Sequence, residues 1–117
     1  ITQTKLASYY TLWDDLLAEL IPFNGNWNSI VIKCKQVGIL CIDALTNTNI
    51  FSGNYNHVCA RINMIIKNRI LTNKPTIVTS NYAPEVFLQD LENPFRVFMQ
   101  KSLHLCLDNN YIRSQNQ

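Results

Sequence analysis

The segment from Val37 to Ile42 constrains the fold more than any other part of this 117-residue chain. It reads VGILCI, a nearly continuous apolar run, and it ends abruptly at Asp43. An apolar run of this length without alternation is typical of a parallel β-strand that is buried on both faces. The segment therefore predicts a strand of a parallel sheet with a carboxylate at its carboxyl end.

A second strand of this kind is predicted one helix further along the chain. Thr76 to Thr79 is a β-branched run typical of a strand, and Ser80 and Asn81 follow it at once. Between the two strands runs an amphipathic helix, which Lys74-Pro75 ends. The apolar side of this helix comprises Val58, Ile62, Ile65, Ile66 and Ile70.

The first third of the chain predicts a helix and one ambiguous segment. Leucines at helical spacing within Leu12–Leu20 indicate the helix. Thr11 and Asp14 form a capping-box-like start, and Pro22 ends the helix. Residues 30–34 fit a short strand and a helix equally well.

Two prolines mark helix starts in the last third of the chain. Pro84 suits the first turn of a short helix through about Leu91, and Pro94 suits the start of another. The polar residues 108–117 predict a short strand or a tail. No linker divides the sequence, so residues 1–117 are expected to form a single domain.

This order of elements predicts an α/β fold. Right-handed crossovers between consecutive strands give a parallel sheet with helices on both faces, which is a three-layer core. In such sheets ligands bind at the carboxyl ends of the strands. Asp43 and Asn81 both follow an apolar strand, so we expect them at one shared edge of the sheet.

Composition narrows the functional classes. The formal net charge of +2 is too small to indicate nucleic-acid binding by itself. No apolar run approaches the ~18 residues of a membrane span, so no membrane partner is expected. The cysteines are irregularly spaced in apolar surroundings, which indicates free thiols in a reducing compartment, the cytoplasm. The alternatives are a disulfide framework and a zinc site that includes His57 or His104.

Two polar groups carry the functional prediction. Four apolar residues followed by Asp43 match the Walker B pattern, in which the carboxylate holds the water shell of a nucleotide-bound Mg²⁺. Any strand that ends in Asp fits this pattern, so the second strand with its terminal amide strengthens the prediction. The alternative interpretation is that Ser80 and Asn81 only cap the helix that begins at Pro84.

Together these segments resemble the AAA+ core of bacterial helicase loaders and transposition helper ATPases, the DnaC, DnaI and IstB group. The resemblance rests on VGILCIDAL (37–45) and INMIIKNRILTNKPTIVTSNYAPE (62–85), and it is most specific at PTIVTSN. YYTLWDDLLAEL (9–20) is similar to the strand and helix that precede Walker B in this group. The resemblance implies the P-loop NTPase fold of the AAA+ type, present here as the C-terminal part of the core.

The resemblance also implies roles for single residues. Asp43 would be the Mg²⁺-linked acid, and Asn81, with Ser80 beside it, would be the sensor that orients water near the γ-phosphate. Arg96 lies where the group carries arginines that reach a neighbouring subunit's phosphates, although the further arginine expected one helical turn on is missing. Arg69 matches a basic position of the group, either in a structural salt bridge or at a subunit interface.

Two departures from the group argue against a self-contained ATPase. The group follows its first acid with a second one that polarises the attacking water, and here Ala44 stands in that position. Hydrolysis is therefore expected to be slow or absent. The chain also contains no GxxxxGK(S/T) loop. ATP and Mg²⁺ are thus expected as cofactors only if a phosphate loop precedes Ile1 in the natural protein, and not if the lineage lost that loop.

Three functional hypotheses follow. The first is a DNA-replication accessory ATPase-like domain, which forms a homo- or hetero-oligomer and helps to place a replicative helicase on DNA, with single-stranded DNA as a further candidate partner. The second is a non-hydrolysing adaptor or decoy of the same fold that binds a helicase or a loader. The third is the core of a viral or plasmid superfamily 3 Rep helicase. The basic side chains either line a DNA-facing surface or form an ordinary solvated face; they are Lys33, Lys35, Lys67, Arg69 and Lys74.

Overall fold

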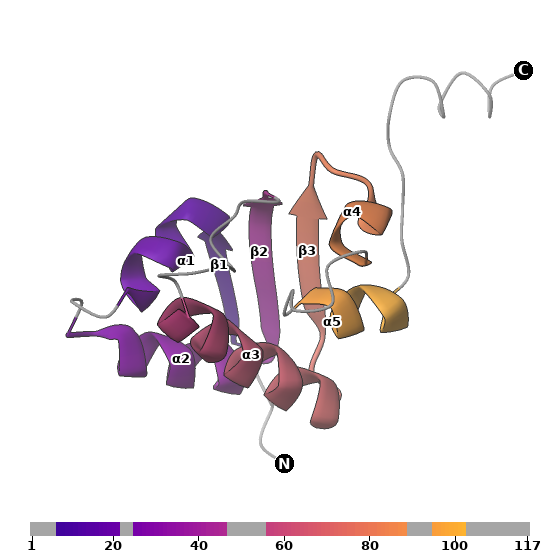
Figure 1. Ribbon diagram of the computed structural model, residues 1–117. Coiled ribbons are helices and arrows are strands. Elements are labelled where there is room, and N and C mark those ends of the chain that lie inside the picture. Colours follow the sequence, from indigo (N-terminus) through magenta and orange to yellow (C-terminus); the bar gives the residue numbers. More distant parts are fainter. Residues whose placement is uncertain (1–6, 22–24, 47–55, 89–94, 103–117) are drawn as a thin grey trace, which may run out of the picture.

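The computed structural model describes residues 7–21, 25–46, 56–88 and 95–102 of the chain. These residues form an α/β fold in which helices pack against a parallel sheet (Figure 1). Within these ranges, no helix is both long and apolar enough to cross a bilayer. The helices are α1 (Trp13–Leu20), α2 (Trp27–Gln36), α3 (Asn56–Leu71), α4 (Pro84–Leu88) and α5 (Phe95–Lys101).

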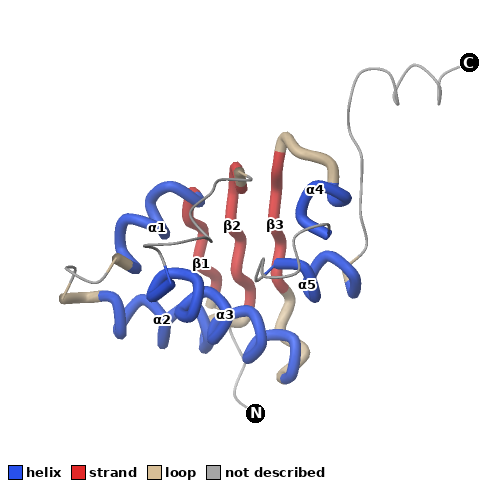
Figure 2. The backbone as a smooth tube through the Cα atoms, in the orientation of Figure 1, coloured by secondary structure: helices blue, strands red, loops and turns tan. Residues whose placement is uncertain are grey.

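The sheet contains β1 (Ser8–Leu12), β2 (Ile39–Leu45) and β3 (Thr76–Ser80) in that spatial order, and neighbouring strands are parallel (Figure 2). The middle strand, β2, contains most of the apolar run, and β3 contains the β-branched run. Both strands are confirmed, and so is the α/β class with a parallel sheet. The predicted strand end at Asp43 is corrected, because β2 continues for two residues to Leu45. The predicted burial on both faces is corrected as well, because only alternate residues of β2 are fully buried. The strand implied by the resemblance at the start of the chain is β1.

The start of α1 corrects the capping-box prediction. Thr11 belongs to β1, and its hydroxyl donates to the carbonyl of Leu12 at 3.2 Å. The helix begins at Trp13 directly after the strand, and no side-chain hydrogen bond caps it. Residues 30–34, whose pattern fitted two structures, lie within α2. The helical extension predicted as far as Leu91 and the polar segment 108–117 lie outside the described residues.

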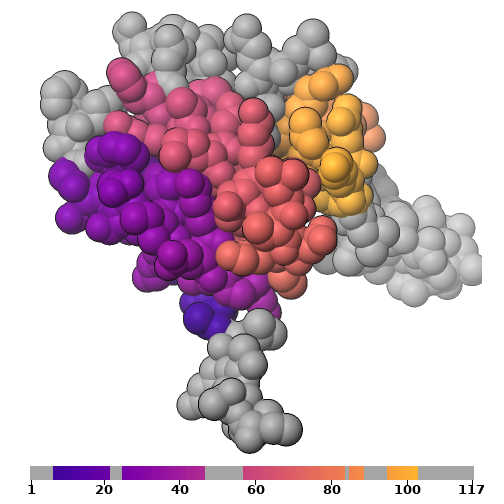
Figure 3. All heavy atoms as spheres, turned by 90° about the horizontal axis from the view of Figure 1, so that it is seen from below, coloured from indigo at the N-terminus to yellow at the C-terminus, as the bar shows by residue number. Residues whose placement is uncertain are grey.

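Both crossovers of the sheet run on one face. From β1 to β2 to β3 the chain steps in the same direction across the sheet. Right-handed crossovers that step in one direction place their helices on the same side. Figure 1 shows α2 and α3 on the near side of the sheet, and Figure 3 shows α5, in yellow and orange, beside the salmon segment that runs from α3 into β3. The helices and this face of the sheet share one core, which includes Trp13, Leu16, Leu40, Ile42, Ile62, Phe87 and Phe95.

The opposite face of the sheet is exposed in the described part of the chain. Tyr10 is 59% exposed, Ile77 53% and Leu12 41%, although parallel sheets are usually covered on both faces. The described residues therefore form two layers, with the helices on one side of the sheet. We call the exposed surface the open face; by strand alternation it comprises Ser8, Tyr10, Leu12, Ile39, Cys41, Asp43, Ile77 and Thr79.

The side chain of Arg69 joins the end of α2 to the segment before β3, at the amino-terminal edge of the sheet. Its side chain is only 1% exposed, and its acceptors are backbone carbonyls and one hydroxyl instead of a carboxylate. Arg69 thus has the predicted structural role, but through hydrogen bonds to neutral groups and not through a salt bridge. Because its side chain is buried, Arg69 does not belong to a DNA-facing surface or a subunit interface. At 2.6–3.2 Å the guanidinium donates to the carbonyls of Cys34, Val37, Gly38 and Pro75 and to the hydroxyl of Thr76.

Candidate functional site

Asp43 is the centre of a polar cluster on the open face. Its two carboxylate oxygens accept hydrogen bonds from the hydroxyl of Tyr10 on β1 and the hydroxyl of Thr79 on β3. Each of three adjacent strands therefore contributes one side chain. Tyr10 pairs with Cys41 in the sheet, so its long side chain reaches Asp43 diagonally across two residues of β2. We call Tyr10, Asp43 and Thr79 the Asp43 cluster.

A β-bulge directly after Asp43 holds this cluster together. Ile42 pairs with Val78 and Leu45 with Ser80, so two residues of β2 lie opposite Thr79 alone. Ala44 takes up the extra length with a φ of 61°, a left-handed conformation that costs a non-glycine residue about 1–2 kcal/mol. Its N–H donates to Thr79 Oγ1 at 2.9 Å. Bulges of this kind change the direction of a side chain. Here the bulge lets both the Ala44 N–H and the Asp43 carboxylate bond to the Thr79 side chain of β3.

The hydrogen bonds keep the carboxylate ionised. The bond from Thr79 is the largest cause that lowers the pKa of Asp43, and the bond from Tyr10 is the next. The same contact with Asp43 raises the pKa of Tyr10. An ionised carboxylate is an acceptor only, and a lowered pKa makes it a weak base. The cluster is therefore suited to hold a cation or its water shell, and not to remove a proton from a substrate.

Cys41, beside the cluster on the open face, is a poor nucleophile. Burial, and secondarily the charge of Asp43, raises the pKa of its thiol. Only the thiolate attacks or binds metal, so this group stays inert near neutral pH. Cys34 and Cys41 are free thiols, and the described residues contain no group of three or more His, Cys, Asp or Glu side chains that could hold a metal ion.

We predict that Thr79→Val raises the pKa of Asp43 toward its ordinary value, because it removes the strongest donor. In the wild type the folded pKa lies below the unfolded one, so the cluster stabilises the fold above about pH 4. This contribution disappears as the pH falls through the folded pKa. An NMR titration of the Asp43 carboxyl carbon measures the shift directly. Tyr10→Phe is expected to raise the pKa less, and the reverse order would contradict this account.

Asn81 and Ser80 lie at the same edge of the sheet as Asp43. Ser80 is the last residue of β3 and pairs with Leu45, the last residue of β2. Its hydroxyl donates to the Leu45 carbonyl at 2.7 Å and accepts from the N–H of Tyr82 at 3.0 Å. Ser80 thus joins the two strand ends and shapes the turn toward α4. Asn81 follows β3 directly and is exposed to solvent.

Arg96 is not brought to this edge. It lies in α5, which Figure 1 shows near the lower part of the sheet, whereas β2 and β3 end at the top. Its Nε donates to the carbonyl of Leu88 at 3.3 Å, and this bond joins α5 to the end of α4. Within the chain Arg96 therefore has a structural contact, and it does not belong to the Asp43 cluster.

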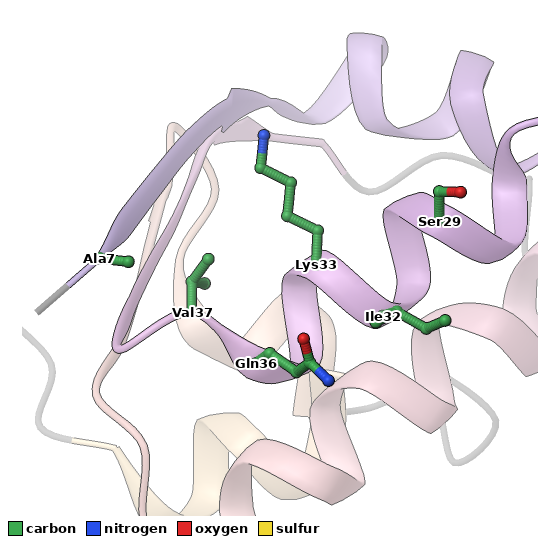
Figure 4. A pocket seen from close by; sticks show the side chains of 6 residues that line it. All are labelled: Ala7, Ser29, Ile32, Lys33, Gln36 and Val37. Carbon is green, nitrogen blue, oxygen red and sulfur yellow. The ribbon is translucent and has the colours of Figure 1, made fainter.

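The described residues line two surface hollows beside the sheet, and Asp43 itself lines neither of them, although its partner Tyr10 lines the smaller one. The larger, of about 450 Å³, includes Ala7, Lys33 and Val37 and so lies at the amino-terminal edge of the sheet (Figure 4). Its Lys33 amino group sits 4.1 Å from the centre of the Tyr9 ring. The other hollow, of about 380 Å³, lies between β1 and α1 and includes the acidic Asp15 and Glu19, which repel phosphate.

Sequence reasoning found Asp43 but missed its partners. Tyr10 and Thr79 carry no motif, and they meet Asp43 only because of the register of three strands. The only local signal was alternation, which puts Tyr10 and Asp43 on the exposed side of their strands.

Comparison with known proteins provides no assignment. No family model matches the chain. The search of the curated proteins finds no match, and neither does the search of the solved structures.

Proposed function

We propose that this chain is an AAA+-like domain of the helicase-loader type that responds to Mg²⁺-bound ATP but hydrolyses it slowly or not at all. The supporting observation is the register of β2 and β3. It pairs Leu45 with Ser80 at the carboxyl ends of neighbouring parallel strands, so Asp43, two residues before Leu45, and Asn81, directly after Ser80, lie near the edge where ligands of α/β sheets bind. The three-layer form of this core would need helices over the open face as well.

The chemistry of the edge suits Mg²⁺ better than it suits phosphate. Mg²⁺ keeps several water ligands and needs only one or two carboxylates beside the nucleotide phosphates, and Asp43 is an ionised carboxylate. Asn81 is an exposed amide that would orient water at the same edge. Ala44 has no group to accept a proton, which is why we propose weak or absent hydrolysis. No side chain of the Asp43 cluster is a cation that would hold phosphate.

The proposed partners follow from the proposed family. The domain would assemble as a homo- or hetero-oligomer and bind a replicative helicase, and Arg96 would then face a neighbouring subunit's nucleotide. Single-stranded DNA is a further proposed ligand. Of the basic residues considered for DNA, Lys67 is exposed, whereas Lys74 donates from Nζ to the carbonyl of Lys35 at 2.8 Å and supports the end of α2.

A melting experiment tests nucleotide binding. Mg²⁺-ATP at millimolar concentration should raise the Tm of the chain, because a ligand present at its own Kd already stabilises the fold by about 0.4 kcal/mol. Asp43→Asn should abolish the part of the shift that depends on Mg²⁺, whereas Glu85→Gln, on the neighbouring helix α4, should keep it. An unchanged Tm in Mg²⁺-ATP would exclude a nucleotide site built from these residues alone.

A second candidate is a non-hydrolysing adaptor that acts through protein binding. Both carboxylate oxygens of Asp43 already accept hydrogen bonds within the chain, and the open face exposes large apolar side chains. These features also suit a surface that binds another protein. An absent Tm shift combined with retained binding to a purified replicative helicase would decide for the adaptor.

A further inference from the structure

The open face forms a contiguous apolar surface with a single carboxylate. Tyr10, Cys41 and Ile77 are register partners and so form one row across the three strands. Leu12 and Asp43 form the next row toward the carboxyl edge. Three of these side chains are more than 40% exposed, which is unusual for neighbours on one parallel sheet. A partner for this surface must be apolar and must carry a cation for Asp43.

The outer side of α3 has these properties. Met64 is 46% exposed and Leu71 is 81% exposed, the largest value among the exposed large apolar side chains of the described residues. Lys67 is also exposed and lies between them at spacings of three and four residues, so the three side chains form one helical stripe. Seven residues of helix span roughly 10 Å, close to the length of the two rows on the open face. We call Met64, Lys67 and Leu71 the α3 stripe.

We propose that the open face of one copy of this chain binds the α3 stripe of a second copy. The apolar ends of the stripe would pack on Tyr10 and Ile77, and Lys67 would donate to the Asp43 carboxylate, which has acceptor capacity beyond its two present hydrogen bonds. A helix over a parallel sheet is also the arrangement by which α/β proteins cover such faces.

The proposed contact joins two different surfaces of the same chain. A head-to-tail contact of this kind does not close after two copies but continues into a ring or a filament. The inference uses no nucleotide and so does not rest on the proposed function. Association is therefore measured without ATP and with a chelator present, which keeps its outcome separate from the melting experiment.

Sedimentation velocity over a concentration series tests the proposal. The wild-type chain should show a mass that rises with concentration beyond that of a dimer. Ile77→Glu on the open face and Leu71→Glu on the α3 stripe should each weaken association by about tenfold or more. Both positions are exposed, so both variants should fold, and far-UV circular dichroism verifies this. Ile32→Glu on α2 and Val97→Glu on α5 are matched controls, because both residues are similarly exposed and should associate like the wild type.

Mixing the two disabled variants gives the sharpest outcome. Ile77→Glu keeps an intact α3 stripe and Leu71→Glu keeps an intact open face, so an equimolar mixture should form a dimer that cannot extend. A mixture that stays monomeric would overturn the proposal. So would a wild-type chain that stays monomeric throughout the series, or an association that Ile77→Glu abolishes but Leu71→Glu leaves intact. Lys67→Glu should weaken association, and adding Asp43→Lys in the other copy should restore it.

Discussion

Replacing Arg69 with methionine is expected to destabilise the fold by about 3–5 kcal/mol, since it removes the donor of five hydrogen bonds to buried or partly buried groups. Methionine fills much of the same volume but donates no hydrogen bond. The carbonyls of Cys34 and Val37 lie where α2 ends, and a cation there also balances the helix dipole. The carbonyl of Pro75 keeps one hydrogen bond in the variant, because it also accepts from the N–H of Leu40 at 3.2 Å. The loss is a large share of the about 5–15 kcal/mol that stabilises a typical domain.

Equilibrium unfolding in urea measures this effect. Lys67→Met, an exposed change on the same helix, is the matched control and should stay within about 0.5 kcal/mol of the wild type. Arg69→Lys should fall between the two, because an ammonium keeps the charge but cannot reach all the acceptors of the planar guanidinium. Equal losses for Arg69→Met and Lys67→Met would show that the hydrogen bonds of Arg69 contribute nothing to stability.

Truncating Trp13 to alanine is expected to cost about 3–5 kcal/mol, the usual loss for a large aromatic side chain in a core. Trp13 is fully buried at the first position of α1, directly after β1. Its ring meets Phe95 of α5 edge to face, with the centroids 5.5 Å apart. The substitution thus leaves a cavity between the first and the last described helices of the chain. Unfolding followed by circular dichroism measures the loss.

Trp27→Ala is the comparison for this prediction. Trp27 is half-buried at the start of α2, and the Arg61 guanidinium lies 3.7 Å from the centre of its ring. Trp27→Ala should destabilise the fold by less than half as much as Trp13→Ala, because Trp27 is partly exposed and water can occupy the space that its ring leaves. A double-mutant cycle of Trp13→Leu and Phe95→Leu should return a coupling of about 0.5–1.5 kcal/mol. A coupling near zero would mean that the two rings do not interact.

The Asp43 cluster shows where sequence reasoning stops. The carboxylate near the carboxyl end of β2 was predictable, because an apolar run followed by Asp indicates a strand of a parallel sheet. That the strand continues past Asp43 to Leu45 was not predictable. The donors Tyr10 and Thr79 were not, because their contact depends on the register between strands that lie more than thirty residues apart in the chain. The left-handed conformation of Ala44 was not predictable either. Alanine is disfavoured in this conformation, and Ala44 adopts it here at the β-bulge, which arises from the pairing with β3.

The sequence alone determined the strands and helices with strong periodicity, the parallel direction of the sheet and the core side of α3, because these depend on the spacing of apolar residues within one segment. Tertiary structure alone decided the strand order β1-β2-β3, and with it the single covered face of the sheet. It also decided that Arg69 is buried among carbonyls, since its acceptors come from two segments of the chain, residues 34–38 and 75–76. Order, register and the partners of polar groups arise from the packing of distant segments, and no local spacing records them.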